Sequence, residues 1–156
     1  MKEIPLTRGK VALVDDEDYE LLNQWKWYAV KSHNCWYAQR TIYQGVNNSY
    51  IKMHRLILNT PEGMQSDHIN GNGLDNRREN LRVCTNTENC RNQKPQKHSS
   101  IFKGVTLYKS RNKWVARIKV SRSSINLGIF NSELEAAQAY DKAAEKYFGE
   151  FARTNL

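Results

Sequence analysis

The residues best suited to chemistry in this sequence are an Asp-His pair, Asp67 and His68, with Asn80 and Asn89 further along the chain. Cleavage of a phosphodiester needs an activated water and stabilisation of the charge that develops on the phosphate, and a divalent ion can supply the stabilisation. The Asp67 carboxylate is a hard oxygen ligand of the kind that Mg²⁺ and Mn²⁺ prefer, and the Asn89 amide oxygen can add a second. The His68 imidazole is a suitable base for water at neutral pH. This group is therefore a candidate metal-dependent nuclease centre.

Short elements must hold these residues together. We expect a strand that ends at the Asp-His pair, a polar loop, a second strand near residues 81 to 84 and then a helix. Residues 85 to 88 have the Ser/Thr-x-x-Glu spacing of a capping box, which places Asn89 in the first turns of that helix. Asn80 is expected to clamp the backbone behind His68. Asp-His and Asn-Gly pairs are also ordinary turn residues, so it is their joint spacing that supports a site.

The first 50 residues are predicted to be rich in β-structure. Residues 4 to 14 predict two short strands around a turn at residues 8 to 10, and Asp15 or Asp16 can cap a helix from Glu17 to Trp25. Residues 25 to 30 and 36 to 43 alternate as half-buried strands do.

Two alternatives stay open in this region. Its tryptophans and tyrosines can stack on nucleic-acid bases, but aromatic side chains in a small sheet more often form the core, and we favour the core. Residues 51 to 58 predict a short strand or helix. His54 within it is either a buried, hydrogen-bonded histidine or a further catalytic candidate.

The charge of the 156-residue chain is distributed unevenly. The net charge is +8, and between Pro95 and Phe130 there are eight basic residues and no acidic one. Such a stretch favours a polyanionic partner. In the first part of the chain, four arginines form a local basic surface suited to phosphates: Arg77, Arg78, Arg82 and Arg91.

The cysteines and the apolar segments exclude other classes. The three cysteines contain no Cys-x-x-Cys pair, so the sequence predicts neither a zinc knuckle nor a disulfide framework, and a reduced compartment fits best. No apolar run approaches the length needed to span a bilayer, and the first residues lack the core of a signal peptide. We expect a soluble, intracellular protein with no membrane partner.

Residues 95 to 100 predict a linker, and residues 101 to 156 a second domain. Residues 102 to 108, 113 to 120 and 124 to 130 alternate apolar with basic or polar side chains, which predicts a three-stranded antiparallel sheet. A helix follows from Ser132, supported by Glu135 three positions on, and stops at Gly149. Its alanine-rich side is expected to cover the apolar face of the sheet, leaving a basic face for the DNA major groove. A charged outer face is more commonly only solvated.

Two family resemblances rest on these motifs. Residues 67 to 72, 74 to 82 and 85 to 89 resemble the HNH homing endonucleases, in the variant with asparagine in place of the final histidine. The resemblance implies a ββα-metal centre at about residues 64 to 94, with His68 as general base, Asp67 and Asn89 as metal ligands and Asn80 as the orienting residue. Histidine at the Asn89 position is the commoner form. Residues 53 to 57 also resemble the segment that precedes this centre in the family, without assigning a role to His54.

The last third of the chain, over residues 99 to 155, is similar to the plant ethylene-response-factor type of DNA-binding domain, which also occurs in phage and bacterial HNH endonucleases. Its DNA-contacting positions fall here on Lys103, Thr106, Tyr108, Arg117, Lys119, Ser124 and Asn126. Several of these are arginine or tryptophan in the plant proteins, so the plant sequence preference does not transfer. Further basic residues expected at the DNA are Lys109, Arg111, Lys113 and Arg122.

The combined prediction is an α+β protein with an HNH nuclease domain (residues 1 to 94) and an appended sheet-type DNA-binding domain. It would hydrolyse double-stranded DNA with Mg²⁺ or Mn²⁺ and no other cofactor, as a monomer that nicks one strand, in the cytoplasm of a phage-infected or bacterial cell, associated with the nucleoid when bound to DNA. The alternative is a non-catalytic DNA-binding regulator on a nuclease scaffold. A structural or RNA-binding protein is a third class, disfavoured because no aromatic RNA-stacking motif is evident.

Overall fold

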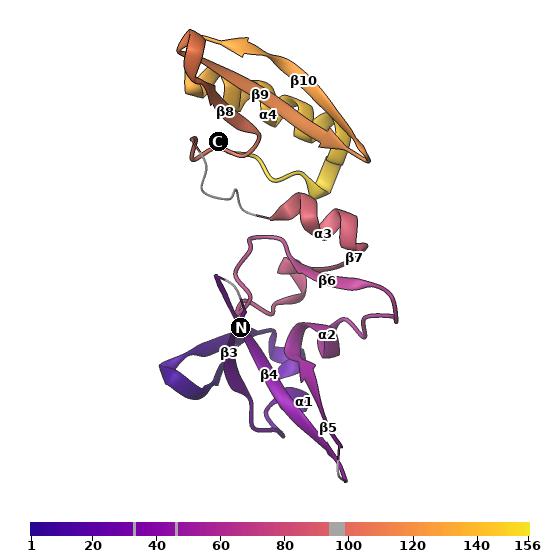
Figure 1. Cartoon of the computed structure of the whole chain (residues 1–156). Coiled ribbons are helices and arrows are strands. Elements are labelled where there is room, and N and C mark those ends of the chain that lie inside the picture. The colour runs from indigo at the N-terminus through magenta and orange to yellow at the C-terminus, as the bar shows by residue number, and fades with distance from the viewer. Residues whose placement is uncertain (33, 46, 94–98) are drawn as a thin grey trace. The chain divides into compact units, whose positions relative to one another are not determined.

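The structure is a computed structural model that describes residues 1–32, 34–45, 47–93 and 99–156. It divides into two compact units, unit 1 (Met1–Asn89) and unit 2 (Cys90–Leu156), each with its own sheets. The expected linker at residues 95 to 100 lies largely outside the described residues. The two units are coloured from indigo to magenta and from red to yellow in Figure 1.

Unit 1 contains three antiparallel sheets of two or three strands, joined by short helices. In chain order its elements are β1 (Lys2–Pro5), β2 (Val11–Val14), α1 (Asp16–Leu22), β3 (Tyr28–Ser32), β4 (Cys35–Gln44), β5 (Asn47–Lys52), α2 (Met53–Ile57), β6 (Gln65–His68), β7 (Leu81–Cys84) and α3 (Asn86–Asn92), whose last residues belong to unit 2. The sheets pair β1 with β2, β3 with β4 and β5, and β6 with β7. Two 3-10 turns, Thr7–Gly9 and Arg78–Asn80, interrupt the connections.

The core of unit 1 joins the first hairpin to α1, the central sheet and α2. Its buried members are Ile4, Ala12, Val14, Leu22, Trp27, Ala38, Met53, Ile57 and Leu81. Trp27 and the packing of Trp25 against this cluster confirm the core role for these two aromatics, whereas Tyr43 and Tyr50 are exposed. The first 52 residues therefore form a scaffold on which α2 and the β6–β7 hairpin rest.

The largest error in the predicted elements of unit 1 concerns residues 23 to 27. The predicted helix runs to Trp25 and the next strand starts there, but α1 ends at Leu22 and β3 begins at Tyr28. The Trp27 indole donates a hydrogen bond to the Leu22 carbonyl at 2.8 Å, which satisfies a carbonyl at the end of α1. Burial of the Trp27 ring, with Trp25 packed against the same core, overrides the local alternation.

Unit 2 is a three-stranded antiparallel sheet covered on one face by a helix (Figure 1). Its elements are β8 (Val105–Tyr108), β9 (Lys113–Val120), β10 (Ser123–Phe130) and α4 (Glu133–Phe148), with the strand order β10-β9-β8. Ser132 caps α4 by accepting from the Leu134 amide at 3.1 Å, and Gly149 ends it with φ 54°. The predicted sheet and helix are confirmed.

The first strand of unit 2 starts three residues later than predicted. Residues 102 and 103 are held by side chains instead of by a neighbouring strand: the Phe102 amide donates to Ser100 Oγ at 2.9 Å, and the Lys103 amide donates to Asn155 Oδ1 at 2.6 Å. Asn155 is in turn fixed by the buried Asp141 carboxylate of α4, which accepts from its backbone and its side chain. The end of the chain therefore belongs to the fold of unit 2.

Small residues let α4 lie close to its sheet. Ala136, Ala137 and Ala144 are each 0 % exposed, and Ile118 of β9 packs with Tyr140 in the same core. The α+β class predicted from the sequence is confirmed for the described residues. None of the helices in the described ranges is long and apolar enough to cross a bilayer.

Gly104 is the tightest point in unit 2 and supports a stability prediction. A Cβ there would lie 2.1 Å from the Tyr140 ring and 2.6 Å from the Arg117 carbonyl, and its φ is +74°. We expect Gly104→Ala to reduce the free energy of unfolding of unit 2 by about 2–3 kcal/mol through overpacking and strain. Amide hydrogen exchange of β9 measures this.

Gly149→Ala is the matched control, because Gly149 also has a positive φ but no atom lies within 4 Å of the position that its new methyl group would take. Its cost should be limited to about 1–2 kcal/mol of backbone strain, and Gly104→Ala should cost more because overpacking is added to strain. Equal destabilisation by the two substitutions would contradict the steric explanation.

Candidate functional site

The β6–β7 hairpin places the Asp-His pair at the end of its first strand. Asp67 is opposite Arg82 and His68 is opposite Leu81 in the antiparallel register. Both Asp67 and His68 are 6 % exposed. Successive side chains of a strand point to opposite faces, so the two functional groups leave β6 on different sides.

The loop between β6 and β7 is held by side chains that bond to its own backbone. Asn80 donates from Nδ2 to the Asp75 carbonyl at 2.8 Å, and its Oδ1 accepts from the Asn70 amide at 2.9 Å. The Ile69 amide donates to the Asn80 carbonyl at 2.9 Å. Asn80 therefore joins the two ends of the loop directly after His68.

Strand β2 fixes the far side of the same loop. The Leu13 amide donates to the Leu74 carbonyl at 2.9 Å, and the Asn76 amide donates to the Leu13 carbonyl at 2.8 Å. Leu13 and Asp75 form an isolated parallel bridge. The N-terminal region thus positions the loop that contacts His68.

Asn76 is the loop residue that meets the histidine. It is 0 % exposed, its Nδ2 donates to the Leu74 carbonyl at 3.2 Å, and its Oδ1 lies 3.4 Å from His68 Nε2. An amide oxygen only accepts, so this contact holds a proton on Nε2; when the imidazole is neutral, Nδ1 is then its basic nitrogen. Burial lowers the pKa of His68, while the contact with Asn76 opposes that shift.

Asp67 is paired inside the hairpin. Its Oδ2 accepts from Arg82 Nε at 3.0 Å and from Arg82 Nη2 at 2.8 Å, and both side chains are nearly buried. The guanidinium balances and orients the carboxylate in this low-dielectric position. A cation at Asp67 would have to share the carboxylate with Arg82.

Asn89 lies on α3, which follows the β6–β7 hairpin directly. The expected capping box is present: the Thr85 amide and hydroxyl donate to Glu88 Oε2, and the Glu88 amide donates to Thr85 Oγ1 at 3.2 Å. The Asn89 amide bonds to the Thr85 carbonyl at 3.0 Å, which puts Asn89 in the first turn after the hairpin. Its side chain is partly exposed.

His54 lies against the predicted base. Its ring centroid is 4.7 Å from that of His68 in an edge-to-face arrangement, and Tyr37 packs near both rings. His54 is 4 % exposed, and its Nδ1 has no hydrogen-bond partner in the described part of the chain. Burial, followed by the effect of the neighbouring His68, lowers the pKa of His54 to about 2. His54 is therefore a neutral ring that packs behind His68.

The Asp67 carboxylate and the Asn89 amide are the types of donor that a hard divalent cation prefers. Among the residues that the structure describes, no group of three His, Cys, Asp or Glu side chains comes together to hold a metal. Mg²⁺ sites commonly have only one or two protein carboxylates, and water and substrate phosphate fill the other positions. Asp67 and Asn89 supply oxygen donors of this kind.

Two arginines predicted to bind phosphates are ion-paired within unit 1. Arg77 donates to both oxygens of the buried Asp75 carboxylate at 2.8 Å. Arg78 donates to Asp18 of α1 at 2.6 Å and 2.8 Å. These bonds brace the loop against the N-terminal region. Contact of Arg77, Arg78 or Arg82 with phosphate stays a prediction. It requires each guanidinium to bind the phosphate while it keeps its bond to the carboxylate.

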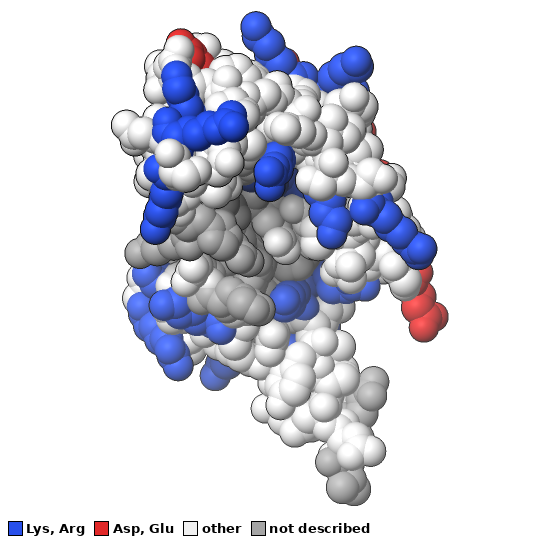
Figure 2. Space-filling model, turned by 45° about the horizontal axis from the view of Figure 1, so that its top comes forward, with Lys and Arg blue, Asp and Glu red and all other residues white. Residues whose placement is uncertain are grey.

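Unit 2 carries the other predicted contacts on the sheet face turned away from α4, here called the outer face. Alternation places the following side chains on it: Thr106, Tyr108, Lys113, Val115, Arg117, Lys119, Ser124, Asn126 and Ile129. Lys109, Arg111 and Arg122 are exposed in the adjoining turns. Figure 2, a view of the whole chain, shows Lys and Arg side chains over much of the visible surface and acidic ones at its margins.

Two other predicted contacts in unit 2 have internal partners. Lys103 Nζ donates to the carbonyls of Arg91 and Gln93, and burial lowers the pKa of Lys103 to about 8. The Arg91 guanidinium lies 4.8 Å from the centroid of the Phe148 ring. These internal contacts neither support nor contradict DNA binding by Lys103 and Arg91, which stays a prediction.

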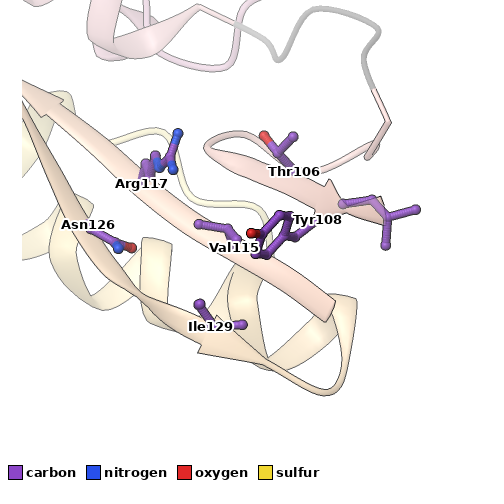
Figure 3. A pocket seen from close by; sticks show the side chains of 7 residues that line it. Thr106, Tyr108, Val115, Arg117, Asn126 and Ile129 are labelled. Carbon is purple, nitrogen blue, oxygen red and sulfur yellow. The ribbon is translucent and has the colours of Figure 1, made fainter. Parts of the chain in front are cut away.

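The outer face is less uniformly basic than predicted. Its centre is a hollow of about 310 Å³, here called the outer-face hollow, lined by Thr106, Leu107, Tyr108, Val115, Arg117, Asn126 and Ile129 (Figure 3). The expectation of one apolar and one basic face is wrong at this point, because Val115 and Ile129 come from the strand positions that point outward.

Sequence reasoning missed Asn76, Asp75 and Tyr37. Asn76 and Asp75 lie in the predicted loop, where asparagine and aspartate are expected as turn residues, so their types did not distinguish a site contact. Tyr37 is far from the Asp-His pair in sequence and has no signal beyond the aromatic alternation of β4.

Comparison with known proteins finds two family models. Residues 59–91 match the HNH endonuclease model, and residues 100–150 match the AP2 domain model. The chain is 30% identical over 158 aligned positions to an uncharacterised HNH endonuclease of Acanthamoeba polyphaga mimivirus, with coverage of 95% of this chain and 76% of that protein.

Plant proteins match the last part of the chain only. APETALA2-like protein 2 of Oryza sativa subsp. indica is 48% identical over 60 residues, and the AP2-like ethylene-responsive transcription factor ANT of Arabidopsis thaliana is 42% identical over 60 residues. Each match covers 37% of this chain but only 14% and 11% of the respective plant proteins. The likeness is therefore that of a shared domain.

The burial of His54 predicts how the stability of unit 1 depends on pH. Its folded pKa of about 2 lies below the ordinary value of 6.5. The unfolded chain therefore binds a proton that the folded unit does not, and the stabilisation is fully present above pH 6.5 and is lost as the pH falls. The limiting slope is about 1.4 kcal/mol per pH unit.

His54→Phe keeps an aromatic ring and removes this titration. Between pH 7 and pH 5 the stability of the wild type should fall by about 2 kcal/mol more than that of the variant. Urea unfolding followed by tryptophan fluorescence measures this, since three of the four tryptophans, Trp25, Trp27 and Trp36, lie in unit 1, and Trp114 of unit 2 contributes equally in both proteins. The same pH dependence in both proteins would contradict the assignment.

Proposed function

Because this chain belongs to the HNH endonuclease family and carries a C-terminal AP2 domain, we propose that it hydrolyses double-stranded DNA at the Asp67–His68 site. The observation that carries the proposal is the contact of His68 Nε2 with Asn76 Oδ1, in a loop braced from both sides. This contact fixes the tautomer of the neutral imidazole, with the proton on Nε2, so that Nδ1 is the nitrogen that can take a proton.

His68 acts as the general base. Its Nδ1 accepts a proton from a water as the water oxygen forms a bond to phosphorus, and the 3′ oxygen leaves with a proton from solvent. By family resemblance the products carry 5′-phosphate and 3′-hydroxyl ends. The lowered pKa of His68 keeps the imidazole unprotonated at neutral pH, as this role requires.

Asp67 and Asn89 would hold the divalent ion, Mg²⁺ or Mn²⁺, in the ββα-metal arrangement that the family resemblance implies. When bound, the ion supplies stabilisation of the charge on the phosphate and on the leaving oxygen. Arg82 orients the Asp67 carboxylate, and Asn80 holds the backbone after His68. An asparagine at position 89 is a neutral ligand, so we expect weaker metal binding than with histidine there.

Unit 2 would supply DNA affinity through its outer face, as an α4-backed sheet in the major groove. A three-stranded sheet can present side chains to base edges and phosphates, and the stretch from Pro95 to Phe130 has no acidic residue to oppose the phosphates. Domain boundaries at about residues 94 and 101 belong to the same proposal. One catalytic site per chain predicts nicking by a monomer.

A DNA-binding regulator without catalysis is the second candidate. The Arg82 pair at Asp67 favours it, because the guanidinium already neutralises the proposed ligand. The regulator would bind DNA as the nuclease does, and the two candidates differ only in whether DNA is cleaved.

Plasmid nicking separates the two candidates. We expect wild type to convert supercoiled plasmid to the open circle with Mg²⁺ or Mn²⁺ and not with EDTA. His68→Ala should lower the single-turnover rate by about 10²–10⁴-fold while retaining DNA affinity, because only the base is lost. Wild type that binds DNA but does not nick with any divalent ion supports the regulator and excludes the nuclease.

The role of the outer face has its own test. Lys119→Ala should reduce the slope of log affinity against log salt concentration by about 0.9, the change for one lost phosphate contact. Lys142→Ala is the control, since Lys142 is also exposed but lies on α4. Fluorescence anisotropy on a duplex with EDTA gives both slopes. Equal slopes for the two variants would exclude Lys119 from the interface.

A further inference from the structure

The outer-face hollow is an apolar spot at the centre of a polar face. Thr106, Val115 and Ile129 are directly paired across the three strands and form one row. Val115 is 8 % exposed, whereas Ile129 is 49 % exposed. Figure 3 shows these side chains with Tyr108, Arg117 and Asn126, which come from the same three strands.

The neighbouring row is polar and suited to base edges. Arg117 and Asn126 are paired across β9 and β10. The Gly128 amide donates to Asn126 Oδ1 at 3.2 Å, which orients the carboxamide over the bulge of β10. Arginine and asparagine side chains can form bidentate hydrogen bonds with guanine and adenine in the major groove.

The two rows match the spacing of base pairs. Outward-facing positions along a strand are about 6.6–6.8 Å apart, close to two base-pair steps of about 3.4 Å. An apolar contact at one row and a polar contact at the next therefore fall within one short stretch of duplex. The apolar group that DNA presents in its major groove is the C5-methyl of a pyrimidine.

We propose that the outer-face hollow binds the C5-methyl group of a pyrimidine, and so makes recognition by unit 2 depend on thymine or 5-methylcytosine. The methyl would contact Ile129 and Val115, with the Tyr108 ring beside it. This inference rests on the proposed binding of DNA by unit 2 and adds which chemical group of the base is recognised. Phosphates would bind at Lys113 and Lys119, the charged outward positions of β9 on either side of the two rows.

The experiment removes single methyl groups from DNA. The preferred site is first selected from random duplexes with the full chain in EDTA. Each thymine is then replaced singly by uracil, and each cytosine by 5-methylcytosine, with affinities measured by anisotropy. We expect one position at which loss of the methyl weakens binding about fourfold, the ratio that corresponds to burying one methyl-sized group.

Protein variants locate the contact. Ile129→Ala should bring the thymine-to-uracil affinity ratio at that position to about 1. Leu134→Ala is the matched control, because Leu134 is 47 % exposed against 49 % for Ile129 but lies on α4, and it should keep the fourfold ratio. Neither side chain belongs to the core of unit 2, so both variants should fold.

The 5-methylcytosine arm distinguishes the source of the methyl. With cytosine at the sensitive position, an equal gain on methylation identifies any C5-methylated pyrimidine, whereas a gain confined to thymine identifies thymine itself. Absence of any methyl-sensitive position, or a ratio unchanged in Ile129→Ala, would overturn the proposal while leaving DNA binding intact. Tighter binding of the single strand without methyl dependence would overturn it in favour of base stacking on Tyr108. If the wild-type chain binds no duplex at all, the proposed function itself is contradicted.

Discussion

The structure of unit 1 depends on satisfying polar groups in the loop between β6 and β7. This loop contains no strand, so its backbone amides and carbonyls need other partners. Asn80, at the end of the loop, bonds to Asn70 near its start and to Asp75 in its middle, and Leu13 of β2 pairs with the residues on either side of Asp75. Asp75, 3 % exposed, is held by Arg77 and Asn70. A buried carboxylate without such partners would cost several kcal/mol. These bonds explain how a glycine- and asparagine-rich loop can present Asn76 to His68 in one orientation.

The need to satisfy polar groups in this loop also explains a role of the N-terminal region that its sequence does not predict, which is to hold the loop. Arg78 bonds to Asp18, and its backbone amide donates to Asp15 at 2.7 Å, so the region around α1 also holds the loop. Arg77 and Arg78, whose guanidinium groups could bind phosphate, instead position the loop. The charge in unit 2 is arranged differently. Lys113, Arg117 and Lys119 lie on one sheet face, in a part of the sequence that contains no acidic residue.

How far the sequence predicts this structure depends on whether the determining interactions are local. The capping box at Thr85 and Glu88, the hairpins and the cap at Ser132 depend on neighbours within a few residues, and they were predicted correctly. The ends of α1 and β8 were not, because Trp27 and Asn155 set them through contacts that alternation does not encode. The approach of His54 and Tyr37 to His68, and the apolar row on the outer face, likewise require strand register between distant segments.

The most direct test of the central claim is where a divalent ion binds. Mn²⁺ added to the ¹⁵N-labelled full chain broadens NMR signals near its site through its unpaired electrons. We expect the backbone amide of His68 and the side-chain amide of Asn89 to broaden first, and Asp67→Asn to abolish this selectivity. Broadening that appears first at residues remote from the β6–β7 hairpin, or that is unchanged in Asp67→Asn, would contradict the assignment of the metal site.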